Sequence, residues 1–328
     1  MRNGPRRLSP TNRERQISSV SRPFAKREPP VIDGDLTDRL VIGTVQLGLP
    51  YGRHRASTVR HEDSAFRILD AAWSLGIRAF DTAEAYGSSA RRLRAWSDAR
   101  GNAEALEVIT KCSIDTPDES LHALEEEANK ALRRFSGVRR VVLLTHGAVP
   151  ADRWPALLAV SAAHDALVGQ SVYSANEVSA ACALPSIGRL QVPGNVLDSR
   201  AIRARGESAV PLDVRSVYLQ GVLLDAPSLA DARAPGAAGI TAAVQDAAAE
   251  LDTSLASLLI ASMLRVIRCD DRLVIGIDNV SQLEALPAAF EIPDATVREF
   301  QTTVTCLADD PALAVLLDPR SWPSQQSG

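Results

Sequence analysis

The feature that most constrains the fold is a regular alternation of short apolar segments with longer Ala/Leu/Arg segments of helical spacing, starting after Asp38. The candidate strands cover residues 39–48, 76–83, 106–113, 139–147, 165–174, 188–195, 214–224 and 272–279. The candidate helices include residues 62–75, 88–100, 118–135, 151–163, 175–183 and 280–290. Continuous apolar strands that alternate with helices indicate a parallel sheet covered by helices. Eight such units predict an α/β protein with the (β/α)8 TIM-barrel architecture.

A doubly wound parallel sheet is the main structural rival. That fold usually places a Gly-rich turn directly after its first strand, where the turn opens a helix. Here the first candidate strand continues as "GTVQLGLPYG", and Pro50 and Tyr51 follow where a GxGxxG helix would begin. The pattern therefore favours the barrel.

The first 38 residues have a different composition, rich in Arg, Ser and Pro and poor in large apolar side chains. Such a segment cannot bury enough apolar surface to offset its chain entropy. We predict a disordered N-terminal extension over residues 1–38 and a barrel domain over residues 39–328. An organellar transit peptide has a similar composition and is the less favoured interpretation.

Charge and cysteine usage exclude several classes of partner. The formal net charge of −4 gives no reason to expect nucleic acid. The sequence has no apolar run of about 18 residues and hence no predicted membrane span. Its four cysteines are scattered without a CxxC pair, as expected for reduced thiols in a cytoplasmic protein.

Polar residues follow three successive candidate strands at the edge where such barrels carry their active sites. Asp81 ends the second strand, and Tyr86 lies in the loop after it. Lys111 ends the third strand and His146 ends the fourth, each one βα unit further along the chain. We therefore expect these four side chains to share one site.

The four residue types suit the reduction of a carbonyl group. A tyrosine can give a proton to the carbonyl oxygen, but its ordinary pKa of about 10 is high for work at neutral pH. A lysine ammonium nearby stabilises the phenolate and lowers that pKa, and an aspartate keeps the lysine charged. A histidine can orient the substrate oxygen. Asp81, Tyr86, Lys111 and His146 are the predicted catalytic residues.

At these residues the sequence resembles the aldo-keto reductase superfamily. The matching segments are "GIRAFDTA", "YG", "ITK", "VGQSVYS", "LQVPGNVLD", "SVYLQG" and "VIGIDNVSQLEAL", in order over roughly residues 39 to 290. The resemblance implies a barrel enzyme that reduces a small aldehyde or ketone, with NADP(H) as cofactor and NAD(H) as an alternative. The "LQG" on the seventh candidate strand is similar to a bacterial branch of the superfamily. The resemblance does not identify partner proteins.

The same resemblance implies the cofactor-binding residues. Ser171 and Gln191 match positions that hydrogen-bond the nicotinamide carboxamide, which needs both a donor and an acceptor. Residues at the last strand and the following helix match the pyrophosphate and adenosine site, where a glycine permits close backbone approach and a helix N-terminus favours anions. Those residues are Gly276, Asp278 and Gln282.

The chain departs from the family pattern at the cofactor site. Arg215 stands where an aromatic residue commonly stacks on the nicotinamide, and Val172 replaces the usual Asn. No basic residue lies near Asp278 to bind a 2′-phosphate. The sequence therefore leaves open whether the cofactor is NADPH or NADH. The resemblance implies that the substrate pocket is built mostly from variable loops, here the segments near residues 49–58, 148–154 and 225–239.

Three functions compete at this point. The favoured one is an NAD(P)H-dependent reductase of aldehydes or ketones, including carbonyls derived from sugars. The second is a regulatory protein of the same fold that binds the cofactor but turns over slowly. The third, a metal-dependent hydrolase or isomerase, would need several His and acidic residues at strand ends, where only His146 and Asp81 qualify.

Overall fold

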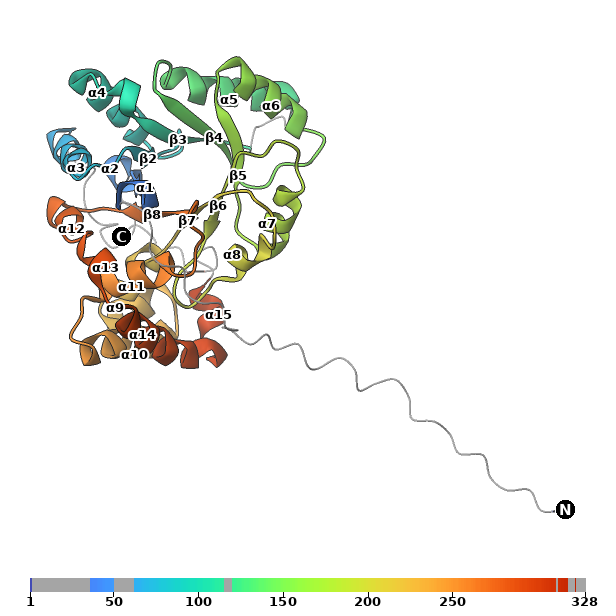
Figure 1. Cartoon of the computed structure of the whole chain (residues 1–328). Coiled ribbons are helices and arrows are strands. Elements are labelled where there is room, and N and C mark those ends of the chain that lie inside the picture. The colour runs from blue at the N-terminus through green and yellow to red at the C-terminus, as the bar shows by residue number, and fades with distance from the viewer. Residues whose placement is uncertain (2–35, 50–61, 115–119, 311, 318–321, 323–328) are drawn as a thin grey trace.

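The computed structural model describes residues 1, 36–49, 62–114, 120–310, 312–317 and 322 of the 328-residue chain. In these residues eight parallel strands pair in chain order, and β8 pairs with β1 to close a barrel (Figure 1). The strands are β1 Leu40–Gly43, β2 Ala79–Asp81, β3 Glu107–Cys112, β4 Arg140–His146, β5 Leu167–Ser171, β6 Arg189–Pro193, β7 Leu212–Arg215 and β8 Arg272–Gly276. The predicted (β/α)8 architecture is confirmed.

Helices cover the outside of the barrel (Figure 1). The α-helices are α1 Leu36–Arg39, α2 Val45–Gly48, α3 Glu62–Ser74, α4 Ser89–Arg100, α5 Leu121–Arg134, α6 Trp154–Ala163, α7 Ala175–Cys182, α8 Arg200–Ala204, α9 Pro227–Arg233, α10 Ala237–Glu250, α11 Leu255–Leu264, α12 Val280–Glu284, α13 Ala288–Glu291, α14 Asp294–Thr305 and α15 Leu313–Leu316. The 3₁₀ segments are η2 Ala103–Ala105, η3 Leu219–Leu224 and η4 Cys306–Asp309.

Helix α5 illustrates why these segments become helices. The Ser120 hydroxyl accepts a hydrogen bond from the Ala123 amide at 3.0 Å, which satisfies one of the free N–H groups at the helix start. Apolar residues at helical spacing, including Leu124 and Ala128, are buried against the barrel. Arg133 and Arg134 lie in the last turn, where positive charge is favourable.

The core has two layers. A small cluster, Val41, Ala79, Ile109, Val142, Leu144 and Val274, comes from strands only, and a far larger one joins the strands to the helices. Neighbouring strand residues such as Val41 and Ile42 fall in different layers, because successive side chains point to opposite faces. The strands are buried on both faces, which explains their continuous apolar sequences.

An ionic layer lies at the opposite end of the barrel from the predicted site. The Asp213 carboxylate is buried and accepts hydrogen bonds from Arg189 and Arg272, each at 2.9 Å. Arg272 also donates to Glu107 at 2.6 Å, across two intervening strands. Burial alone would raise the pKa of Asp213, but the two arginines outweigh it and hold that pKa below its ordinary value.

Two segments differ from the sequence prediction. The expected strand over residues 214–224 is wrong beyond Arg215, because residues 219–224 form η3. Ser216, Leu219 and Gln220 have φ values of 66°, 49° and 54°, a left-handed conformation that no strand contains. The expected loop over residues 225–239 holds α9 and the start of α10 instead.

The predicted N-terminal extension overlaps the described residues only at positions 1 and 36–38. Residues 36–38 belong to α1, and the Arg39 guanidinium next to them donates to the Asp271 carbonyl at 3.2 Å. The predicted domain boundary after residue 38 stays a prediction. The rest of the predicted extension, like the predicted substrate loop over residues 50–58, lies outside the described residues and stays a prediction.

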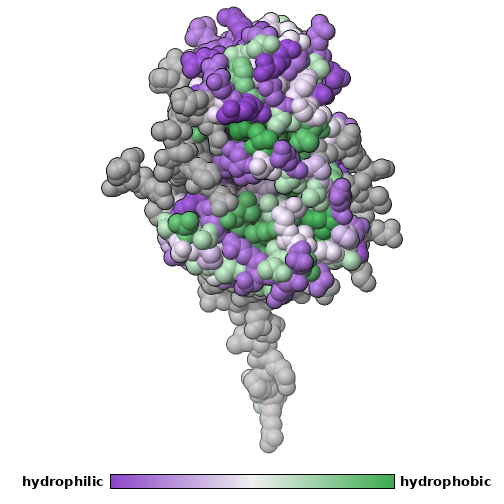
Figure 2. All heavy atoms as spheres, turned by 90° about the vertical axis from the view of Figure 1, so that its left-hand side faces the viewer, coloured by the Kyte–Doolittle hydropathy of each residue, from purple (hydrophilic) through white to green (hydrophobic). Residues whose placement is uncertain are grey.

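None of the helices in the described part of the chain is, by itself, long and apolar enough to cross a membrane. The α10–α11 pair meets that test by length and composition when joined, but it is bent by 93°. Figure 2 shows the side of the molecule that carries α3 and α12, where polar side chains dominate and apolar ones gather across the middle. Helix α11 is buried along most of its length, from Ser257 to Leu264.

Candidate active site

Asp81 and Lys111 form a buried ion pair at the carboxyl ends of neighbouring strands. Asp81 is the last residue of β2, Lys111 lies near the end of β3, and the Lys111 ammonium contacts the Asp81 Oδ1 atom. The ammonium also donates to the Thr82 carbonyl at 3.1 Å. Only 1% of the lysine side chain is exposed, so it has no access to solvent and depends on these partners.

Burial lowers the pKa of Lys111, and the Asp81 carboxylate opposes that shift by favouring the charged form. The predicted role of Asp81, keeping this lysine charged, fits the observed contact. The Asp81 carboxylate also accepts a hydrogen bond from Gln191 Nε2 at 2.6 Å. One carboxylate therefore joins β2, β3 and β6 in the centre of the barrel mouth.

Tyr86 lies in the loop between β2 and α4, above this pair. The Tyr86 amide donates to the Ala83 carbonyl at 3.1 Å, and the Ser89 amide donates to the Tyr86 carbonyl at 3.1 Å, so the loop is a tight turn. Gly48 of α2 packs directly against it, since a Cβ added at Gly48 would lie 2.0 Å from the Tyr86 carbonyl oxygen. Only a glycine allows α2 to hold the loop at this distance.

The Tyr86 ring contacts two of the other three predicted catalytic residues, Lys111 and His146. Its centroid lies 5.1 Å from Lys111 Nζ and 6.2 Å from the His146 ring, which meets it edge to face. His146 is the last residue of β4 and is half-buried. The structure thus brings Asp81, Lys111, Tyr86 and His146 into one cluster.

The pKa of Tyr86 differs from the sequence expectation. Burial of the phenol raises that pKa above its ordinary value, the Asp81 carboxylate raises it further, and Arg215 acts in the opposite direction. We expected the lysine to lower it. That expectation is wrong, because desolvation and the Asp81 carboxylate raise the pKa of Tyr86 by more than Arg215 lowers it.

Ser171 and Gln191, the predicted carboxamide partners, lie on neighbouring strands. Ser171 ends β5, Gln191 is in the middle of β6, and the serine hydroxyl donates to the Gln191 Oε1 atom at 3.2 Å. Both are buried. Gln191 borders the cavity described below, whereas Ser171 lies behind it.

Arg215, the last residue of β7, stands beside this cluster. Its guanidinium lies 4.2 Å from the centroid of the Tyr173 ring and donates to the Val172 carbonyl at 3.3 Å. It also donates to the Ser216 hydroxyl at 3.4 Å. The arginine therefore lies over one aromatic ring and borders the cavity described below.

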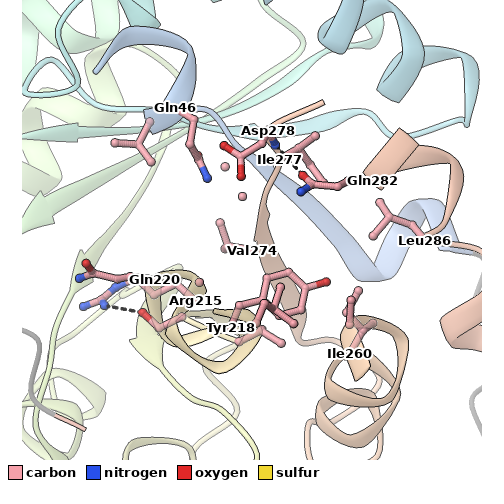
Figure 3. Close-up of a pocket in the computed structure, with 18 of the residues that line it drawn as sticks. Gln46, Arg215, Tyr218, Gln220, Ile260, Val274, Ile277, Asp278, Gln282 and Leu286 are labelled. Carbon is pink, nitrogen blue, oxygen red and sulfur yellow. Dashed lines mark hydrogen bonds between the residues drawn. The ribbon is translucent and has the colours of Figure 1, made fainter. Parts of the chain in front are cut away.

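A cavity of about 530 Å³ begins at this cluster and runs along the barrel mouth. Asp81, Tyr86, Gln191 and Arg215 border one part of it, and Gly276, Asp278 and Gln282 border another. Its size falls within the usual range of small-molecule sites. Figure 3 shows Arg215, Tyr218 and Gln220 on one wall, and Asp278, Gln282 and Leu286 on the wall opposite.

The wall opposite Arg215 is built from β8 and α12. Gln282 Oε1 accepts a hydrogen bond from the Asp278 amide at 2.7 Å, and Asn279 caps the helix by accepting from the Gln282 amide at 3.0 Å. A Cβ added at Gly276 would lie 2.4 Å from Gln46 Nε2, so the end of the Gln46 side chain lies directly over this strand end. Gln46 Oε1 is buried and finds no hydrogen-bond partner among the described residues.

The sequence interpretation missed part of this cavity. Gln46 follows the first strand and carries no motif, and the α11 residues that border the cavity belong to no motif either. The turn at Ser216–Gly221 was not predicted, because its sequence is mostly apolar. The glycine of "LQG" was a sequence signal for a turn, and in the structure it has a φ of 89°. The described residues contain no group of three or more His, Cys, Asp or Glu side chains that could hold a metal ion.

Comparisons with known proteins find one matching family model and several solved structures of similar fold. Residues 39–152 match the sequence model of the aldo/keto reductase family. Similar structures include a glycerol dehydrogenase from Gluconobacter oxydans, with 16% identity and a TM-score of 0.66 over 87% of this chain and 96% of that one. The holo form of an aldo-keto reductase from Bacillus halodurans has 19% identity and a TM-score of 0.59, over 81% and 94% of the two chains.

A third similar structure is an aldo-keto reductase from Klebsiella pneumoniae in complex with NADPH, with 15% identity and a TM-score of 0.59 over 81% of this chain and 91% of that one. No curated protein matches the chain. The resemblance to the aldo-keto reductases predicted from the sequence motifs is confirmed, by the family match over residues 39–152 and by the fold over most of the chain.

Proposed function

We propose that this protein is an NAD(P)H-dependent reductase of small aldehydes or ketones, with Tyr86 as the general acid. The observation that carries the proposal is the buried Asp81–Lys111 pair beneath the Tyr86 ring, at the start of a cavity that extends along the barrel mouth. A buried ion pair is costly to maintain and adds little stability, so its place beside a tyrosine in a cavity favours a catalytic role.

The residues present fit a nicotinamide dinucleotide. The cavity is elongated between the Tyr86 cluster and the Gly276–Gln282 wall, and Gln46 offers a buried acceptor without a partner there among the described residues. Gln191 and Ser171 would hold the carboxamide, and Gly276, Asp278 and Gln282 the remainder. When bound, the nicotinamide supplies the hydride for the carbonyl carbon.

The chain's own residues would manage the proton. Because the pKa of Tyr86 is raised, its phenol keeps the proton at neutral pH and can donate to the oxygen of a bound carbonyl group. As the proton leaves, Lys111 and Arg215 stabilise the negative charge that appears on the phenolate. His146, edge-on to the Tyr86 ring, is placed to hydrogen-bond the same substrate oxygen and orient it.

The test is the substitution Tyr86→Phe, assayed by steady-state reduction of 4-nitrobenzaldehyde and by calorimetric titration of NADPH and NADH. We expect turnover to fall by about two to four orders of magnitude, the usual contribution of a general acid. Cofactor affinity should persist, because the proposed cofactor contacts lie elsewhere. Asp98→Asn, which removes the exposed partner of Arg94 on α4, is the control and should leave turnover nearly unchanged.

Turnover by Tyr86→Phe at more than about a tenth of the wild-type value would show that another group donates the proton. Lys111→Met should cause a loss similar to that of Tyr86→Phe. The double variant should be no slower than either, because both residues act in one proton transfer. A wild-type protein that binds cofactor but reduces no carbonyl compound would favour a regulatory role for the same fold.

A further inference from the structure

Arg215 is the only lysine or arginine among the described residues that border the cavity. The acidic residues on the same border are Asp81 and Asp278. Asp81 already pairs with Lys111, so its charge is neutralised locally. The end of the cavity at Tyr86 therefore carries one net positive charge, contributed by Arg215.

No carboxylate in the described part of the chain forms an ion pair with Arg215. Its hydrogen bonds, at 3.3 and 3.4 Å, go to a neutral carbonyl and a neutral hydroxyl. Two buried arginines elsewhere in the barrel have carboxylate partners: Arg272 pairs with Asp213, and Arg205 pairs with Asp271. Arg215 borders the cavity without such a partner among the described residues.

The charge of Arg215 reaches the catalytic pair. It acts to lower the pKa of Tyr86 and that of Lys111, which places both groups within its electrostatic range. A ring that delivers hydride to a carbonyl carbon must lie within about 3–3.5 Å of that carbon, whose oxygen accepts the Tyr86 proton. Such a ring is therefore also within range of Arg215.

We propose that Arg215 makes this cavity bind the reduced form of its nicotinamide cofactor in preference to the oxidised form. The inference rests on the proposed function only in that a nicotinamide binds at the Tyr86 end. In the reaction the carbonyl carbon gains hydride, the oxygen gains the Tyr86 proton, and the cofactor ring is left with one positive charge. Water then returns a proton to the tyrosine.

The neutral reduced ring and the cationic oxidised ring differ little in shape, so the charge of Arg215 distinguishes them. Two like charges about 10 Å apart or closer, at an effective dielectric constant of about 20, oppose each other strongly enough to weaken binding on the order of tenfold or more. The phosphates and adenosine are the same in both forms, and their contacts cancel in the ratio of dissociation constants. The expected consequence is faster release of the oxidised cofactor, which favours turnover in the direction of carbonyl reduction.

The test measures the dissociation constants of NADH and NAD⁺, and of NADPH and NADP⁺, by calorimetry at low salt for the wild type and Arg215→Met. The ratio of the dissociation constant of the oxidised form to that of the reduced form should be smaller in Arg215→Met than in the wild type, by on the order of tenfold or more. Arg215→Lys should restore most of the wild-type ratio. Arg200→Met, an exposed arginine on α8 paired with Asp198, is the matched control and should leave the ratio unchanged.

Two results would overturn the proposal. One is an unchanged ratio in Arg215→Met, and the other is an equal loss of affinity for both forms, which would mean that Arg215 binds a phosphate. Because the assay measures binding, a wild type that discriminates but reduces no aldehyde would support this inference and refute the proposed reductase. A wild type that binds none of the four cofactors would refute both.

Discussion

Replacing Asp81 by Asn tests whether the buried pair works as the structure implies. The variant keeps the shape of the side chain but leaves the Lys111 ammonium, 1% exposed, with the Thr82 carbonyl as its remaining strong partner. Breaking a buried ion pair by removing one partner costs about 3–5 kcal/mol. We therefore expect the free energy of unfolding to fall by that amount at pH 7.

Lys111 sets an upper limit on the loss, because it can lose its proton instead of remaining charged. From an unfolded pKa of about 10.4, neutralising a lysine at pH 7 costs about 3.4 pH units at 1.36 kcal/mol each, or about 4.6 kcal/mol. This upper limit on the loss of unfolding free energy falls as the pH rises. In the unfolded variant Lys111 binds a proton that it does not bind in the folded variant, so the free energy of unfolding should increase by about 2.7 kcal/mol between pH 7 and pH 9.

The assay is urea unfolding at a series of pH values. The wild type should gain less stability over the same interval, because Asp81 favours the charged lysine and opposes the pKa decrease that burial causes. Asp81→Asn combined with Lys111→Met should recover much of the loss at pH 7, since no buried charge is left. Asp98→Asn, which breaks an exposed pair with Arg94, should cost about 1 kcal/mol or less.

A loss of less than about 1 kcal/mol in Asp81→Asn, or a loss that does not diminish with pH, would refute this reasoning. Either result would mean that water or a local rearrangement solvates the Lys111 ammonium. The buried Asp81–Lys111 pair would then no longer support the proposed catalytic role, because a solvated lysine needs no carboxylate to remain charged.

Three further predictions concern the rest of the barrel and its cavity. Asp213→Asn should lower the free energy of unfolding by about 3–5 kcal/mol in urea titrations, because Arg189 and Arg272 lose a shared buried carboxylate. The pKa of Asp213 is held below its ordinary value, so the stabilisation by its carboxylate in the wild type should disappear as the pH falls below about 4. Gly48→Ala should displace the Tyr86 loop, whose carbonyl oxygen would lie 2.0 Å from the new Cβ, and turnover of an aromatic aldehyde should fall on the order of a hundredfold. Unaltered turnover would show that α2 can move without the loop. In calorimetric titrations the dissociation constants of NADPH and NADH should differ by no more than about one to two factors of ten, because the described cavity border offers no second cation for a 2′-phosphate. A preference for NADPH beyond about a thousandfold would mean that an unrecognised basic residue lies at the site.

The sequence predicted the barrel and the grouping of the four candidate site residues for the same physical reason. Neighbouring parallel strands place their carboxyl ends side by side, so residues one βα unit apart meet there without any knowledge of side-chain packing. Asp81 and Lys111 come from adjacent strands and do form a pair. The hydrogen bond between Gln191 and Asp81 joins residues 110 positions apart, and only closure of the barrel brings them together.

Backbone conformation was the least predictable part. The segment at residues 214–224 has the composition of a strand, but Ser216, Leu219 and Gln220 adopt left-handed φ values and the chain forms a turn instead. No side chain in Ser216, Leu219 or Gln220 favours that conformation. The cost of such strain is of order 1–3 kcal/mol per residue and persists only where the surrounding fold imposes it. The segment borders the cavity, where strained residues often serve a function.

Arg215 connects the strand ends to this strained turn, and its position explains why one cation can serve two roles. It is the last regular residue of β7, so the barrel fixes its backbone, and the Tyr173 ring fixes its guanidinium. A charge held in place by the fold cannot reorganise when the tyrosine loses its proton or the cofactor ring gains a charge. The same field therefore stabilises the phenolate and destabilises the oxidised ring. Since both effects arise from one charge, Arg215→Met should weaken proton donation by Tyr86 and also abolish discrimination between the oxidised and reduced cofactor. If two different residues were responsible, a single substitution could remove one effect and leave the other.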